Sequence, residues 1–367
     1  MKVLFFLRSL NIGGAEAFIY NVLSSLDNQK IHIDIVIQTH ENKNKQLLHL
    51  CAEKDIKIFY VAPFEKNYYK SIKELNGIII ENAYDIIHYH ANSLINMVPV
   101  ICAKKNNIRL VLHSHNSNNN LGGYIGKCLH YFNRFIISKL NITRIACGNE
   151  AGCWMFGNKK FTIVNNAIDI DSYRFDIIAR DHLRKKYGIA DSCYVIGHVG
   201  RFVEAKNHKF IIDCFEQINT NYSNVKLVLV GTGDLFNDIR DYVKQKKLDE
   251  IVIFIGEAQE CSMYYSAFDM MLFPSFFEGL PFTLVEAQAS GLPVAASNNV
   301  TKQVNITGLI KYISLKESID TWTKEVMQHR ANQKDRSIYA EMMKESIFDI
   351  NAVIEELADI YVNGEGK

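Results

Sequence analysis

The sequence predicts an α/β protein in which helices cover two parallel sheets. Short β-branched and apolar runs alternate with amphipathic stretches along most of the 367 residues. Such runs are typical of buried strands, and helices that connect parallel strands lie on both faces of the sheet. The alternation restarts after a connecting segment at 161–175. The chain is therefore expected to form two Rossmann-like domains.

The expected strands come in two series, one on each side of that connecting segment. The first series lies at 2–7, 32–38, 57–62, 85–90, 109–115 and 144–148, and the second at 194–200, 226–231, 251–256, 270–275 and 293–297. Helical periodicity marks 15–26 and 68–81 between strands of the first series. From about residue 316 the chain is charged and helical. We predict domains at 1–165 and 166–345, and a C-terminal helix at 346–367 that packs back on the first domain.

The composition indicates a globular protein whose net charge creates no strong electrostatic field. Hydrophobic residues make up 48% and charged residues 22%, and the net charge is +1, which gives no reason to expect nucleic-acid binding. The apolar run in "MKVLFFLRS" is too short for a signal peptide, and no apolar stretch approaches the roughly 18 residues that span a bilayer. The eight cysteines include no C-x-x-C pair. These features favour the cytoplasm.

Two acids frame a helix start within "FFEGLPFTLVEAQASGLPV" at 276–294. Glu278 follows an expected strand and precedes Pro281, a residue suited to the first helical position. We expect a helix over about 281–289, ended by Gly291. Glu278 should then lie in the loop at the carboxyl edge of the sheet, where open parallel sheets bind their ligands.

The start of this helix is also an expected anion site. Glu286 lies inside the helix, while the first backbone N–H groups, near Phe282 and Thr283, have no partner within it. An anion that must coexist with two carboxylates suggests a ligand with both phosphate and hydroxyl groups. A nucleotide sugar has both.

A pair of cations follows another strand of the second series. "RFVEAKNHK" comes directly after the strand at 194–200 and contains Arg201 and Lys206. Two such cations can neutralise a departing diphosphate without a metal ion. A retaining glycosidase would also use two nearby acids, but hydrolysis of a plain glycoside gives no reason for the cations.

These segments resemble a known family. "GHVGRFVEAKN", "LVLVGTGDL" and "FPSFFEGLPFTLVEAQASGLPVAAS" resemble the donor domain of glycosyltransferase family 4. "LNIGGAEAFIYNV" and the strand end "HSHN" resemble its acceptor domain, particularly in enzymes that build bacterial capsule, exopolysaccharide or lipopolysaccharide. The resemblance covers about residues 1–297. It implies a retaining enzyme of the GT-B type, with two Rossmann-like domains facing across a cleft.

The resemblance also implies roles for the residues of the second domain. Glu286 would accept hydrogen bonds from the ribose hydroxyls, and Glu278 would contact the donor sugar near the reacting centre. Arg201 and Lys206 would hold the diphosphate. Further donor-binding residues implied in the same way are Gly231, Gly279, Leu280, Phe282 and Thr283.

In the first domain the resemblance singles out a histidine and two glycines. His115 matches the active-site histidine of the family, with His113 as the alternative. Backbone N–H groups of Gly13 and Gly14 would help to hold the diphosphate. A tight turn before a helix would also explain these glycines, and "GGAE" is not the G-x-G-x-x-G fingerprint of dinucleotide-binding enzymes.

We therefore predict a hexosyltransferase that uses a nucleoside-diphosphate sugar, with uridine as the expected base. The acceptor would be a glycan, carried on a lipid diphosphate at the inner face of the cytoplasmic membrane. No metal or other cofactor is expected. Two alternatives remain open: a nucleotide-sugar epimerase on the same scaffold, and an inactive partner subunit of a glycosyltransferase.

Two patterns raise the possibility of a metal site. "HYH" at 88–90 and "HSH" at 113–115 end neighbouring strands, and alternation puts the histidines of each pair on one face. No acid or cysteine completes a ligand set by spacing. "DID" at 169–171 imitates a metal-binding Asp-x-Asp, but it lies in the connector. There we interpret Asn166 and Asp169 as structural residues that fix the hinge.

The segment 124–140 is expected to form an amphipathic helix. One face carries Ile125, Leu129, Phe132, Ile136 and Leu140, and another carries Lys127, His130 and Arg134. Such a helix could simply pack on the first sheet. It could also contact the membrane that holds a lipid-linked acceptor.

Overall fold

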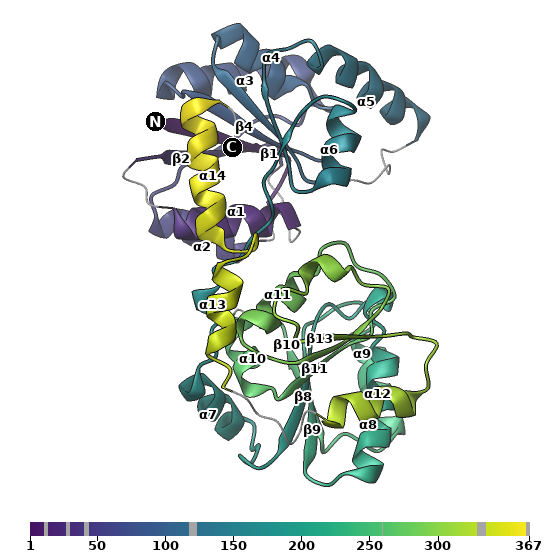
Figure 1. The fold of residues 1–367 in the computed structure, drawn as a ribbon. Coiled ribbons are helices and arrows are strands. Elements are labelled where there is room, and N and C mark those ends of the chain that lie inside the picture. Colours follow the sequence, from purple (N-terminus) through teal and green to yellow (C-terminus); the bar gives the residue numbers. More distant parts are fainter. Residues whose placement is uncertain are drawn as a thin grey trace. The chain divides into compact units, whose positions relative to one another are not determined.

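A computed structural model describes residues 1–10, 14–26, 30–39, 44–116, 123–258, 260–328 and 335–364. The chain forms two compact units, Met1–Ala167 with Ile350–Lys367, and Ile168–Asp349. Each unit is a parallel sheet covered by helices, which confirms the predicted fold class (Figure 1).

The first unit contains a seven-stranded sheet in the order β3-β2-β1-β4-β5-β6-β7. Its strands are β1 (Lys2–Leu7), β2 (His32–Ile37), β3 (Ile58–Tyr60), β4 (Ile86–Ala91), β5 (Arg109–Ser114), β6 (Thr143–Ala146) and β7 (Thr162–Ile163). Its helices are α1 (Gly14–Ser25), α2 (Lys45–Glu53), α3 (Tyr68–Asn82), α4 (Val98–Asn106), α5 (Tyr124–Ile137), α6 (Asn149–Phe156) and α14 (Ile350–Asn363). The strand order reverses direction between β1 and β4, which makes the carboxyl ends of these strands the expected ligand site.

The central strand β1 is buried on both faces. Val3 and Phe5 pack into the core beneath α1 and α14, whereas Leu4 and Phe6 pack into the core on the other face. The C-terminal helix α14 lies beside α1, at the opposite end of the sequence (Figure 1). Arg109 secures its end by donating hydrogen bonds to the carbonyl groups at the end of α14. The last helix thus belongs to the first unit.

The second unit contains a six-stranded sheet in the order β10-β9-β8-β11-β12-β13. Its strands are β8 (Tyr194–Val199), β9 (Val225–Val230), β10 (Val252–Gly256), β11 (Met270–Phe273), β12 (Val294–Ser297) and β13 (Ile310–Ile313). Its α-helices are α7 (Ile177–Lys186), α8 (His208–Asn221), α9 (Phe236–Gln245), α10 (Ser262–Ala267), α11 (Phe282–Ala289), α12 (Ile319–Gln328) and α13 (Ile338–Lys344). Short 3-10 helices are η1 (Asp171–Tyr173), η2 (Glu204–Lys206) and η3 (Lys302–Val304). Here the order reverses between β8 and β11.

The expected strands form, and the structure adds two that the sequence did not predict. β7 is a two-residue strand inside the expected connector, and β13 pairs in parallel with β12 beyond the region of family resemblance. Among the described residues, no helix combines the length and the apolar character needed to cross a membrane.

Candidate active site

The loops after β8 and β11 meet at the carboxyl edge of the second sheet. Nζ of Lys206 lies 2.6 Å from Oε1 of Glu278, and the two side chains are only 16% and 12% exposed. The backbone N–H of Phe276 donates to the carbonyl of Ala205 at 2.9 Å, so the main chains of the loops are joined as well. The cation and the acid singled out in the sequence therefore lie in contact, at the point where the strand order reverses.

Arg201, the second predicted cation, does not contact an acid of the described residues as Lys206 does. Arg201 directly follows Gly200 in the same loop, and its side chain is exposed. Within the described ranges its guanidinium group has no ion pair or hydrogen bond to the protein. Lys206 is thus held by the protein, whereas Arg201 remains available to an anionic ligand.

Gly231 directly follows β9 at the same edge, and its backbone explains why it is glycine. Its φ is +131°, and a Cβ atom there would lie 2.1 Å from the carbonyl oxygen of Gly200. Any side chain would therefore push the loop that carries Arg201 away from its position. Gly279 differs, because a Cβ atom there would meet no atom of the described residues within 4 Å. The surrounding protein gives no reason for glycine at 279.

The helix start between the two acids forms nearly as predicted. α11 begins at Phe282, and Pro281 is its N-cap with φ −80° and ψ 93°. Gly291 follows the end of the helix with φ +61°, as expected of a C-terminal stop. The first N–H groups, including that of Thr283, have no carbonyl partner within the helix, and Leu280 lies in the loop that precedes them. The site therefore has an electropositive helix end next to Glu278.

Glu286 is held by two tyrosines that the sequence analysis missed. The hydroxyl of Tyr265 donates to Oε2 of Glu286 at 2.5 Å, and Tyr173 forms a second hydrogen bond with the same carboxyl group. Burial raises the pKa of Glu286, and the two phenol hydrogen bonds oppose that rise. Tyr265 comes from α10 and Tyr173 from η1 in the connector. No sequence spacing links either residue to Glu286.

In the first unit, His115 lies just beyond β5, in a group of four histidines. Its Nε2 lies 2.9 Å from Nδ1 of His90, and its ring lies 3.9 Å from that of His113. Nε2 of His88 lies 3.2 Å from Nδ1 of His113. The prediction that His88 and His90 share one face of the sheet, and that His113 and His115 do likewise, is confirmed. Gly14 is the first residue of α1, while Gly13 lies outside the described residues.

The geometry of these rings bears on the metal alternative. Ligand nitrogens of His88, His90 and His113 lie within 4.8 Å of one another. However, the rings of His88 and His90 are stacked with an interplanar angle of 16°, and ring nitrogens from the two strands form hydrogen-bonded pairs. A nitrogen whose lone pair accepts a hydrogen bond from a neighbouring ring is not free to bind an ion. The arrangement favours two imidazole pairs over a ligand set.

The aspartates of the connector are engaged in local contacts. Asp169 accepts hydrogen bonds from the backbone N–H of Asp171 and from the hydroxyl of Ser172. Asp171 forms ion pairs with Arg174 and Lys344, and the hydrogen bond from Lys344 is the main cause that lowers its pKa. These contacts support a structural role.

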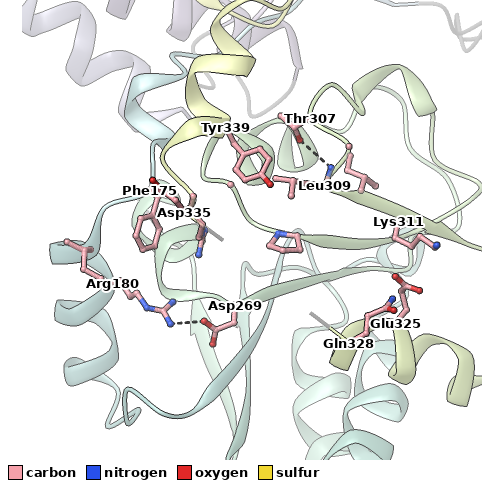
Figure 2. A pocket seen from close by; sticks show the side chains of 16 residues that line it. Phe175, Arg180, Asp269, Thr307, Leu309, Lys311, Glu325, Gln328, Asp335 and Tyr339 are labelled. Carbon is pink, nitrogen blue, oxygen red and sulfur yellow. Dashed lines mark hydrogen bonds and ion pairs between the residues drawn. The ribbon is translucent and has the colours of Figure 1, made fainter. Parts of the chain in front are cut away.

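A pocket of about 860 Å³ lies at the other edge of the second sheet (Figure 2). Asp269, Pro293 and Leu309, which line it, directly precede β11, β12 and β13. Arg180 donates to Oδ1 of Asp269 at 2.6 Å, and Arg336 donates to carbonyl groups at the ends of α10 and α11. Arg336 therefore stabilises helix ends, and Arg180 pairs with Asp269. Ligands of such sheets bind at the opposite, carboxyl edge.

The helix predicted at 124–140 forms with an unexpected orientation. Its buried residues are Gly126, His130, Asn133 and Ile137. His130 accepts a hydrogen bond from the N–H of Leu94, and Asn133 donates to the carbonyl of Leu94. His130, which the sequence groups with Lys127 and Arg134 on one face, is therefore buried, because it satisfies this backbone. The apolar face points outward instead.

Two family models match the chain. Glycosyltransferase Family 4 matches residues 12–172, and Glycosyl transferases group 1 matches residues 179–345. EpsF of Bacillus subtilis is 29% identical over 376 residues, which cover 98% of this chain and 96% of EpsF. The capsular polysaccharide biosynthesis glycosyltransferase CapH of Staphylococcus aureus is 23% identical, with 99% of both chains covered.

Solved structures show the same fold at lower identity. HepE of Anabaena in complex with UDP superposes with a TM-score of 0.75 at 17% identity, covering 98% of this chain and 99% of HepE. WaaG, a glycosyltransferase of lipopolysaccharide biosynthesis, gives 0.67 at 14% identity, covering 99% of this chain and 100% of WaaG. With both family models and the GT-B fold present, the chain belongs to the family 4 and group 1 glycosyltransferases.

Proposed function

We propose that this glycosyltransferase moves a hexose from a uridine-diphosphate sugar to a glycan acceptor, with retention of configuration, in cell-surface polysaccharide synthesis. The contact between Lys206 and Glu278 carries the proposal, because it puts a cation and an acid beside the electropositive start of α11. The names of relatives support the substrate class. They include EpsF, CapH and an Escherichia coli UDP-Gal:alpha-D-GlcNAc-diphosphoundecaprenol alpha-1,3-galactosyltransferase, 24% identical over 245 residues. HepE has been solved with UDP-glucose.

In the proposed reaction, the bond between the anomeric carbon and the diphosphate oxygen breaks. Arg201 and Lys206 neutralise the charge that develops on the leaving diphosphate, helped by the first N–H groups of α11. The acceptor hydroxyl forms the new bond on the same face of the sugar, and its proton passes to the departing phosphate oxygen. Glu286 accepts hydrogen bonds from the ribose, and Glu278 contacts the donor sugar. Because Arg201 and Lys206 supply the positive charge that stabilises the diphosphate, the proposed reaction needs no metal ion.

A panel of nucleotide sugars tests this function. We expect one uridine-diphosphate sugar to release UDP much faster when a lipid-diphosphate-linked glycan is present than when it is absent. Conversion of the donor to an isomer without acceptor would instead identify an epimerase. No turnover with any donor and acceptor, from a folded protein that binds UDP, would identify an inactive partner subunit.

We also propose that α5 contacts an anionic membrane surface. Tyr124, Ile125, Phe132 and Phe135 are 90%, 78%, 63% and 59% exposed. Between Ile86 and Asn149 the sequence contains Lys and Arg residues but no Asp or Glu. An outward apolar face inside an acid-free, basic segment is typical of helices that lie in the interface of anionic lipids.

Vesicle flotation tests this contact. The chain should float with vesicles that contain phosphatidylglycerol and much less with pure phosphatidylcholine. The double variant Ile125→Ser/Phe132→Ser should lose flotation, because it removes exposed apolar area. Ile178→Ser in α7 is the matched control, since Ile178 is 77% exposed in the other unit. Equal flotation of all three proteins would contradict the proposal.

A further inference from the structure

Four histidines form a compact ladder on β4 and β5. His88 stacks on His90 with ring centres 4.2 Å apart, and His113 lies against His115 with centres 3.9 Å apart. His88, His90 and His113 are buried, whereas His115, just beyond the end of β5, is partly exposed. The ladder ends at the carboxyl edge of the first sheet, where the strand order reverses.

Burial favours the neutral form of all four rings. Burial is the first cause that lowers the pKa of each histidine, to about 3 for His115. Each ring therefore carries one N–H group, which can donate a hydrogen bond, and one bare (unprotonated) nitrogen, which can accept one. The hydrogen bonds then depend on which nitrogen of each ring holds the proton.

The nitrogen atoms fall into two independent hydrogen-bonded groups. In one, the hydroxyl of Tyr361 lies 2.5 Å from Nδ1 of His88, whose Nε2 lies 3.2 Å from Nδ1 of His113. In the other, Nδ1 of His90 lies 2.9 Å from Nε2 of His115. Nε2 of His90 and Nδ1 of His115 are buried and have no hydrogen-bond partner among the described residues.

A proton count for the second group leaves two arrangements. Two neutral rings have two N–H groups, and one of them forms the hydrogen bond between the rings. The other is left unpaired, either on Nδ1 of His115 or on Nε2 of His90. A buried unpaired N–H group is costly unless a ligand or water can accept from it. Both nitrogens are buried, but His90 is only 7% exposed as a residue, whereas His115 is partly exposed and directly follows β5 at the edge of the sheet where ligands bind.

We propose that His90 is a positioning residue that fixes His115 as the tautomer with its proton on Nδ1. In that form His115 is a neutral hydrogen-bond donor to an oxygen of the sugar nucleotide or of the acceptor hydroxyl. His90 donates from Nδ1 to Nε2 of His115 and keeps its own Nε2 bare. The hydrogen bond also holds the ring in one orientation. The inference rests on the proposed function, since it assigns His115 to the active site.

Nitrogen NMR of histidine-labelled protein tests the tautomer directly. Long-range proton–nitrogen correlations distinguish bare from protonated ring nitrogens, and His115→Gln identifies the signals of residue 115 by their loss. The expected result in the wild type is a protonated Nδ1 and a bare Nε2 for His115. A protonated Nε2 at His115 overturns the inference, whatever the enzyme's activity.

Two substitutions at position 90 add a kinetic test. His90→Leu should lower kcat by about tenfold or more, with little change in the donor KM, because His115 loses its fixed tautomer and orientation. His90→Asn, which keeps an amide donor near the place of Nδ1, should restore most of kcat and the wild-type NMR pattern. Tyr361→Phe is the matched control, because it removes a buried hydrogen bond from the other group and should leave the signals of His115 unchanged.

The outcomes separate this inference from the proposed function. A folded His90→Leu variant with wild-type kcat and an unchanged His115 tautomer overturns the role of His90. Full activity in His115→Gln refutes the active-site assignment of His115, while the tautomer measurement still decides the pairing. If His90→Leu does not fold, the NMR pattern of the wild type alone decides.

Discussion

Nζ of Lys206 and Oε1 of Glu278 lie 2.6 Å apart, although the two residues are 72 positions apart in the sequence. They come from the loops after β8 and β11, the neighbouring strands between which the order of the second sheet reverses. With most of both side chains buried, the ion pair defines a charged site at the edge where such sheets bind ligands. It is the geometric basis of the proposed donor site.

Arg201→Ala should lower kcat by about 10²–10³, the usual effect of removing one group that stabilises the charge on a leaving group. Because Arg201 is exposed, the free energy of unfolding should change by less than about 0.5 kcal/mol. Arg240→Ala, at an exposed position of α9, is the control and should keep wild-type kinetics. Initial rates with a saturating donor make the comparison, and an Arg201→Ala rate within a few-fold of the wild type refutes the role.

Tyr265→Phe should shift the pH dependence of donor binding. The phenol donates to Glu286 and opposes the rise in pKa that burial causes. Ribose binding needs the ionised carboxylate, so affinity is present above the pKa of Glu286 and is lost as the pH falls through it. Without the phenol that pKa rises further, and the acid limb of a plot of kcat/KM against pH should move to higher pH. An unmoved limb would mean that Glu286 does not contact the ribose.

Substitution by alanine should have different effects at Gly231 and at Gly279, the two glycines of the proposed donor site. Gly231→Ala should lower the free energy of unfolding by about 1–3 kcal/mol, because its Cβ would meet the carbonyl oxygen of Gly200. Gly279→Ala should leave stability unchanged, since its Cβ would lie more than 4 Å from every described residue other than its chain neighbours, yet it should raise the donor KM if the ligand passes close to it. Denaturant unfolding and donor titration measure the two effects. A wild-type KM in Gly279→Ala removes residue 279 from the proposed site.

Removal of divalent metal should leave the rate unchanged. The proposed charge stabilisation comes from protein cations, and the aspartates of the connector are occupied by local contacts. Initial rates in EDTA, with and without added Mg²⁺ or Mn²⁺, provide the measurement. A rate that is abolished by EDTA and restored by either ion would return Asp169 and Asp171 to consideration as ligands.

Much of the fold could be predicted because the strands are continuous apolar runs buried on both faces. The meeting of Lys206 and Glu278 was predictable too, since each follows such a strand and the carboxyl ends of parallel strands share one edge. β7 could not be found in this way, because two residues carry no periodicity.

Contacts between separate elements were not predictable. Tyr173 and Tyr265 reach Glu286 only because η1 and α10 pack beside α11, which no spacing encodes. The orientation of α5 was misjudged for a related reason. Helical periodicity assumes that apolar side chains face the core, but in α5 His130 and Asn133 face inward to satisfy the backbone of Leu94.

The central claim is that Lys206 belongs to the site of the donor diphosphate. Calorimetric titration of UDP and of uridine, into the wild type and into Lys206→Ala, tests it most directly. We predict that the wild type binds UDP at least tenfold more tightly than uridine, and that Lys206→Ala loses most of this difference while its affinity for uridine is unchanged. Wild-type affinity of Lys206→Ala for UDP would contradict the claim.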